Sequence, residues 1–147
     1  MRIKQRTNQL IPVLEELATQ YGFQQEAAQL IDKNEKFTLR LPLVGAFSTG
    51  KSTLINALLG DKLLGVQVTP ETCLPTEIHY AEHESISLMN KQGIVSEISR
   101  QQLKDQHFPI TNPDEEHWID IGLPSSVLAD FKELVLVDMP GWESGIA

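Results

Sequence analysis

The spacing of apolar residues divides the chain into a helical start and a longer part made of short extended runs. Residues 2–20 carry apolar side chains three, four or seven positions apart, which is the repeat of one helix face. The positions on this face are Ile3, Leu10, Leu14, Leu17 and Tyr21. Pro12 is expected to bend this helix or begin a new turn, and Gly22 to end it. With a second, shorter helix over residues 24–32, we expect a helical segment over residues 1–34. Its apolar face serves either as core or, as the alternative, as a site for a partner that leaves it exposed in this chain.

From residue 35 onward the pattern changes to short apolar runs separated by turns and helices. The expected strands are residues 37–44, 76–80, 85–90, 93–97 and 134–137. The expected helices are residues 53–59, ending at Gly60, and residues 99–106, with a loop over 107–117. Lys91 and Gln92 form the turn of a predicted hairpin. Pro42 is unusual for a central strand because it lacks an N–H, so we expect a bulge or a locally unpaired residue there.

The first strand of this series runs into a glycine-rich loop. Residues 45–52 read Gly-Ala-Phe-Ser-Thr-Gly-Lys-Ser and match G-x-x-x-x-G-K-[ST], the phosphate-binding loop of nucleotide hydrolases. A strand, a loop and a helix in this order direct backbone N–H groups at a polyphosphate. Gly45 and Gly50 permit the turns, Lys51 brings a positive charge to the β- and γ-phosphates, and the Ser52 hydroxyl can ligate Mg²⁺.

A second motif ends the last apolar run of the chain. Residues 134–141 read Leu-Val-Leu-Val-Asp-Met-Pro-Gly, a buried type of strand followed by Asp-x-Pro-Gly. In nucleotide switches an Asp at such a strand end holds the water shell of Mg²⁺, and the N–H of the following Gly senses the γ-phosphate. Asp138 and Gly141 are therefore candidate ligands, Asp138 through water.

A nucleotide switch also needs a hydroxyl that reaches the metal when the γ-phosphate is present. The candidate is Thr72, on a proline-bounded loop just before the strand at residues 76–80. Thr69 and Thr76 have the same chemistry and remain alternatives. The expected nucleotide-binding positions are thus Gly45, Ala46, Phe47, Ser48, Thr49, Gly50, Lys51, Ser52, Thr53, Asp138 and Gly141, with Ser52, Thr72 and Asp138 at the metal.

These motifs resemble those of the dynamin-like GTPase family, in particular its bacterial members. Residues 45–60, Gly-Ala-Phe-Ser-Thr-Gly-Lys-Ser-Thr-Leu-Ile-Asn-Ala-Leu-Leu-Gly, look like the first GTPase motif of that family. The second motif and the strand after it are matched by Pro-Glu-Thr at residues 70–72 and Thr-Glu-Ile-His-Tyr at 76–80. Residues 118–124 resemble the family's next extended strand, which a short helix follows, and 137–141 its third motif. The long separation of the first and third motifs also favours dynamin-like proteins over compact small GTPases.

The resemblance implies an α/β fold: a three-layer P-loop GTPase domain over residues 35–147 with a mixed, mostly parallel sheet, preceded by helices. It implies binding of GTP and GDP, Mg²⁺-dependent hydrolysis, and self-association of GTPase domains across the nucleotide. It further implies membrane remodelling by the complete protein. Residue by residue, Ser48 falls on the position whose hydroxyl stabilises the leaving phosphate. Ser48, Lys51 and Thr72 are therefore the expected catalytic residues.

Two positions depart from related GTPases. Phe47 stands where eukaryotic dynamins carry a Gln that orients the attacking water, and Trp142 follows Gly141 where small GTPases carry theirs. An indole has one N–H donor and no acceptor, so it cannot align water through a carbonyl. We therefore expect slow intrinsic hydrolysis that depends on a partner surface.

The residues that would read the base are missing from the sequence. Guanine specificity in GTPases rests on Asn/Thr-Lys-x-Asp at the end of a later strand, and no such run occurs here. Guanine over adenine therefore follows from the resemblance alone. We expect the chain to be a truncated GTPase domain without its later strands, inactive by itself and prone to aggregate through an unpaired edge at residues 37–44.

Composition and charge reduce the classes of partner and of bound group that we expect for this segment. A net charge of −8 disfavours nucleic acid or anionic lipid as a direct partner of this segment. The single cysteine, Cys73, excludes an internal disulfide, and the four histidines lack the spacing of a metal site. No signal peptide or spanning apolar run is present, so we expect a cytoplasmic protein, peripheral to a membrane if the complete protein touches one. The alternatives to a dynamin-like GTPase are another cytosolic P-loop GTPase or ATPase, for example in ribosome assembly, and a nucleotide-binding scaffold without turnover.

Overall fold

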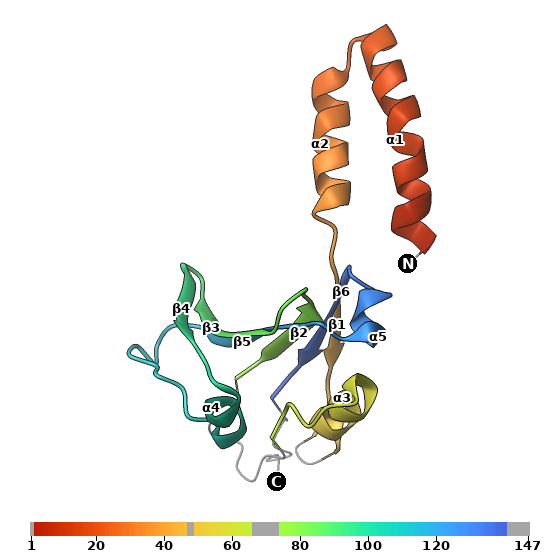
Figure 1. Cartoon of the computed structure of the whole chain (residues 1–147). Helices are drawn as coiled ribbons and strands as arrows, with labels where there is room; N and C mark the ends of the chain where they lie inside the picture. Colours follow the sequence, from red (N-terminus) through yellow and green to blue (C-terminus); the bar gives the residue numbers. More distant parts are fainter. Residues whose placement is uncertain (1, 47–48, 66–73, 141–147) are drawn as a thin grey trace. The chain divides into compact units, whose positions relative to one another are not determined.

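The computed structural model describes residues 2–46, 49–65 and 74–140, and the chain divides into two compact units, Met1–Leu39 and Arg40–Ala147 (Figure 1). The first unit contains α1 (Arg2–Tyr21) and α2 (Gln24–Glu35). Both helices were expected, and α2 is longer than its predicted range. Pro12 lies inside α1 without ending it.

The two N-terminal helices form a hairpin through Gly22, whose φ of 82° only glycine adopts readily. The backbone N–H of Gly22 donates to the carbonyl of Ala18 at 2.9 Å, which closes the last turn of α1. Small side chains fill the contact, since Ala18 and Ala27 are both buried. Of the two expectations for the apolar face of α1, core packing does not hold for most of its members, because Leu10, Leu17 and Tyr21 are exposed.

The second unit is built on one sheet of six strands in the order β1-β6-β2-β5-β3-β4 (Figure 1). The strands are β1 (Leu39–Leu43), β2 (Thr76–Tyr80), β3 (Ser85–Asn90), β4 (Gly93–Glu97), β5 (His117–Leu123) and β6 (Leu134–Asp138). The sheet is mixed, as expected. β2 runs parallel to β5, whereas the β2–β6, β3–β4 and β3–β5 pairs are antiparallel.

The described part of this unit contains three helices: α3 (Lys51–Leu59), α4 (Arg100–Asp105) and α5 (Ser126–Ala129). α3 contacts both α5 and β6, and α5 also contacts β2. The core between helices and sheet consists of branched apolar side chains. Its most deeply buried members are Ile55, Leu63, Ile78, Leu88, Ile119, Ile121 and Leu128. This core fixes the start of α3 beside the end of β6, where the two sequence motifs lie.

Pro42 lies within β1, and β1 is the first strand in the order of the described sheet. A proline is tolerated at such an edge because its missing N–H need not leave a neighbouring carbonyl unpaired. No bulge is required to explain it. The edge carries exposed apolar side chains, including Leu39 and Leu41. Leu43, at the end of β1, packs against the core.

Candidate nucleotide-binding site

The glycine-rich loop joins β1 to α3, and its described residues form a tight turn. Gly50 caps α3 with a φ of 88°, in the left-handed region, and its carbonyl accepts the N–H of Leu54 at 2.8 Å. Gly45 leaves room for the neighbouring hydroxyl of Thr49. A Cβ at this position would lie 3.0 Å from Oγ1 of Thr49, the same hydroxyl that donates to the carbonyl of Ala46 at 2.8 Å. A side chain at Gly45 would therefore require the Thr49 hydroxyl to move by a few tenths of an ångström.

Lys51, the first residue of α3, folds its side chain back over the loop. Its Nζ donates to the carbonyl of Gly45 at 3.1 Å and to that of Ala46 at 3.0 Å. The ammonium group therefore lies at the N-terminus of α3, where the helix dipole and free N–H groups also attract anions. The Lys51 ammonium and the N-terminus of α3 thus both provide positive potential at the same place, which is typical of a polyphosphate site.

The structure brings the two sequence motifs into direct contact. The Ser52 hydroxyl donates to Oδ2 of Asp138 at 2.6 Å, across 86 positions of sequence. Asp138 ends β6, and only 8% of its surface is exposed. Its other carboxylate oxygen, Oδ1, is buried without a hydrogen-bond partner in the described part of the chain. Burial raises the pKa of Asp138, opposed by the hydrogen bond from Ser52 and the charge of Lys51.

This pair of residues fits a magnesium ion. A hydroxyl and a carboxylate are the hard oxygen donors that Mg²⁺ prefers, and Mg²⁺ usually retains several waters beside one or two protein ligands. The unpartnered Oδ1 of Asp138 is a buried acceptor that such a water would satisfy. Across the described residues, no three His, Cys, Asp or Glu side chains gather into a metal-binding cluster.

The other predicted positions divide into placed residues and residues outside the described part. Thr53 lies on the exposed side of α3. Thr76, the alternative to Thr72, begins β2 directly opposite Asp138 in the ladder, is buried, and donates to the carbonyl of Leu74 at 3.3 Å. The predicted positions outside the described residues are Phe47, Ser48, Thr69, Thr72, Gly141 and Trp142.

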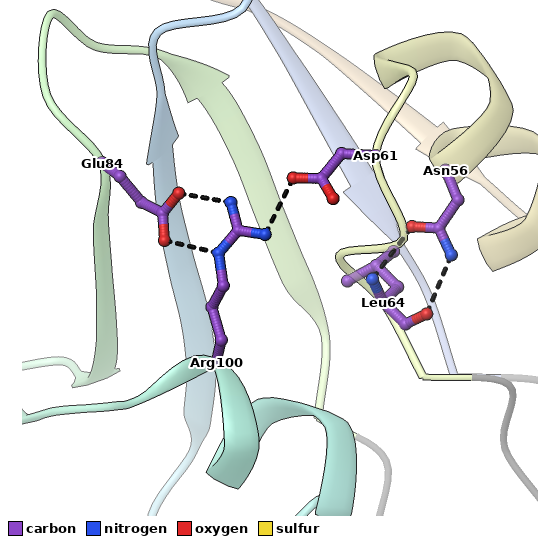
Figure 2. Close-up of polar contacts among 5 residues, drawn as sticks. All are labelled: Asn56, Asp61, Leu64, Glu84 and Arg100. Atoms are coloured by element: carbon purple, nitrogen blue, oxygen red, sulfur yellow. Dashed lines mark hydrogen bonds and ion pairs between the residues drawn. The ribbon is translucent and has the colours of Figure 1, made fainter.

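Asn56, a polar residue one turn beyond Ser52, was not among the predicted site residues. Both ends of the Asn56 side-chain amide bond to the backbone of Leu64, as Figure 2 shows. In the sequence, the only signal is one amide within the apolar run from residue 54 to 59. Such a residue has no pattern of its own, because its partner is a backbone group.

Comparison with known proteins agrees with this geometry. The sequence profile of the Dynamin family matches residues 41–147. The chain belongs to the dynamin family. It is 32% identical over 95% of its length to an uncharacterised protein in the xynA 3′ region of Caldicellulosiruptor sp., and 29% identical over 82% of its length to Dynamin-like protein 2 of Campylobacter jejuni. It spans 35% and 19% of the lengths of these two relatives.

Solved structures give the same result for the fold. Two chains of solved structures are each 26% identical to this dynamin-family chain. Both structures are described as an oligomerised bacterial dynamin pair that provides a mechanism for the long-range sensing and tethering of membranes. The TM-scores are 0.55 and 0.53, over 85% and 98% of this chain and 20% and 23% of the neighbours. The α/β GTPase fold expected from the motifs is thereby confirmed. None of the helices in the described residues has the length and apolar content needed to cross a bilayer.

Proposed function

We propose that the whole protein binds GTP and hydrolyses it with Mg²⁺, and that residues 35–147 contribute the phosphate-binding half of its GTPase domain. The observation that carries this proposal is the contact between Ser52 and Asp138, beside the Lys51 ammonium at the start of α3. Family membership supports guanine as the base. The helical segment at residues 1–34 is proposed to be a separate unit.

Each residue has a distinct task in this proposal. Lys51 exchanges the carbonyls of Gly45 and Ala46 for oxygens of the β- and γ-phosphates. Ser52 and Asp138 would hold a magnesium ion, Asp138 through a water, and the bound ion would supply positive charge at the phosphates. Among the residues outside the described part, Thr72 completes the metal site in the triphosphate state and Ser48 stabilises the leaving phosphate. The Gly141 N–H senses the γ-phosphate.

The test is Lys51→Ala in the whole protein, titrated with a fluorescent GTP analogue in Mg²⁺, with unlabelled GTP and ATP as competitors. Removing the loop's ammonium leaves the polyphosphate charge without its main counter-charge, so we expect binding to be lost. Lys91→Ala is the matched control, because Lys91 is exposed and pairs with Glu116 at 3.0 Å. Unchanged affinity in Lys51→Ala would refute the phosphate-loop assignment, and displacement by ATP as effective as by GTP would refute guanine specificity.

We further propose nucleotide-dependent self-association, coupled in the whole protein to membrane remodelling. The support is membership of the dynamin family and the similarity to structures that are described as an oligomerised bacterial dynamin pair with a mechanism for tethering membranes. Neither Phe47 nor Trp142 can position water, which also favours help from a partner surface. Specific GTPase activity should then rise with protein concentration in the absence of lipid. Constant specific activity across a hundredfold range would contradict it.

A further inference from the structure

The side chain of Asn56 acts as a clamp on the chain that follows α3. Its Nδ2 donates to the Leu64 carbonyl at 2.8 Å, and its Oδ1 accepts the Leu64 N–H at 2.9 Å (Figure 2). One amide thus satisfies both backbone groups of a residue eight positions further on, as a neighbouring strand would. Asn56 is one helical turn after Ser52, so the clamp and the candidate magnesium ligand belong to the same short helix.

A second set of contacts fixes the same short segment, residues 60–65, from the other side. The Arg100 guanidinium, at the start of α4, reaches Asp61 through Nη1 at 2.9 Å and donates to Glu84 through its other two nitrogens, Nε and Nη2, as Figure 2 shows. At Gly65 the backbone passes so close to α4 that a Cβ would lie 2.8 Å from the carbonyl oxygen of Lys104. Residues 60–65 are therefore held at three points.

Hydrophobic burial alone does not explain this arrangement. Leu63 and Leu64 are both buried and would keep the segment against the core, but apolar contact is not directional. The paired hydrogen bonds of Asn56 are directional, and they require Leu64 to occupy one position. A slip of one residue would break both bonds and leave buried polar groups unsatisfied. The clamp therefore sets the register of the chain and not merely its attachment.

We propose that Asn56 is a positioning residue for GTP hydrolysis, an inference that rests on the proposed function. The chain leaves α3 at Gly60, is fixed through Leu64 to that helix, and then leads into the residues that include Thr72. Ser52 and Asn56 share α3, so the clamp fixes the start of this connection relative to the metal ligand. Asn56 itself touches neither the loop carbonyls nor Asp138 in the described contacts, so its action is through Leu64.

The experiment compares Asn56→Ala and Asn56→Asp with wild type in the whole protein, by kcat for GTP, affinity for GDP and thermal unfolding. Alanine removes both hydrogen bonds; aspartate keeps the acceptor for the Leu64 N–H and places a carboxylate against the Leu64 carbonyl. We expect kcat to fall roughly tenfold in both, equivalent to ~1.4 kcal/mol of barrier. Affinity for GDP, which does not need a switch threonine, should change by less than about twofold.

Asn90→Ala is the matched control, because the Asn90 side chain also makes two hydrogen bonds, to Glu115 at 3.2 Å and from the Gln92 N–H at 2.9 Å, at the β3–β4 turn. It should keep wild-type kcat. Asp61→Asn weakens the exposed contact with Arg100 without disturbing the core, so it tests the same segment even if the Asn56 variants do not fold; its kcat should fall by a smaller factor.

The results of these measurements distinguish a positioning role of Asn56 in hydrolysis from a general effect on the stability of the protein. Wild-type kcat in Asn56→Ala, or in Asp61→Asn where the former does not fold, overturns the inference and leaves the proposed function intact. An equal loss of kcat and GDP affinity overturns it as well, since that result describes general damage to the site. Absence of GTP turnover in the wild-type protein overturns the proposed function and the inference together.

Discussion

Asp138 is expected to reduce the stability of the protein while enabling its chemistry, and Asp138→Asn separates the two effects. The carboxylate is 8% exposed, receives one hydrogen bond from Ser52, and has a buried oxygen without a partner in the described residues. Burial of a charge costs free energy unless it is paired and fully hydrogen-bonded. The raised pKa of Asp138 has the same cause and shows that burial outweighs the contributions of Ser52 and Lys51.

The magnitude follows from these opposing contributions. A buried polar group without a hydrogen-bond partner costs about 1–3 kcal/mol, and more when it is charged. Asparagine has nearly the same shape, keeps an oxygen for the Ser52 hydroxyl, and carries no charge. We therefore expect the nucleotide-free variant to be more stable than wild type by about 1 kcal/mol, which raises Tm by roughly 4 °C for a domain of this size.

Magnesium and GTP should reverse this order. A ligand at a hundred times its Kd stabilises the folded protein by about 2.7 kcal/mol, and the variant lacks the charge that holds the metal's water. Thermal unfolding of both proteins in EDTA, and then in Mg²⁺ with a non-hydrolysable GTP analogue, measures both effects. Asp120→Asn is the control: it removes a carboxylate from the same sheet, but one paired with His79 at 3.2 Å, so it should lower stability. An Asp138→Asn variant that is less stable than wild type in EDTA, or that gains the full ligand shift, would refute the reasoning.

Two further predictions concern a switch residue and a pH dependence. Thr72→Ala should lower kcat with little change in GDP affinity, because a switch threonine ligates the metal only in the triphosphate state; a larger loss from Thr69→Ala or Thr76→Ala would move the assignment. His79, whose pKa is raised mainly by its hydrogen bond to Asp120 against the effect of burial, stabilises the fold when protonated. Its contribution is fully present below the unfolded pKa of about 6.5 and is lost as pH rises through the higher folded value. The stability difference between wild type and His79→Gln should therefore shrink on going from pH 6 to 8.5, and a constant difference would contradict the pairing.

The regular elements of the second unit could be predicted from local pattern. The hairpin strands at residues 85–90 and 93–97 have the same bounds as β3 and β4, since alternation and the turn at Lys91 and Gln92 are local signals. The helix ending at Gly60 is likewise observed, with Gly60 in the left-handed conformation at the end of α3. These features depend on neighbouring residues alone.

What could not be predicted depends on partners far apart in sequence. The order of the strands places β1 beside β6, and this order explains Pro42 without a bulge. The Arg100 contacts join residues on α4 and on two loops, and no sequence spacing indicates them. The choice between a buried and an exposed apolar face on α1 also depends on a partner element. The two helices meet through Ala18 and Ala27, whereas periodicity selects the large apolar residues.

The short helix α3 carries the candidate phosphate and metal ligands, a core residue and the clamp residue within about one turn and a half. Lys51 and Ser52 face the candidate phosphate and metal sites, Ile55 is 1% exposed in the core, and Asn56 holds the chain at Leu64. Ile55 anchors the helix in the packed core, which resists small displacements. The distance between the Ser52 hydroxyl and the clamped residue 64 is therefore set by one rigid element. A GTPase that needs a threonine from the following segment to meet Ser52 at a metal gains accuracy from this arrangement, because one helix fixes both the metal ligand and the start of the connection.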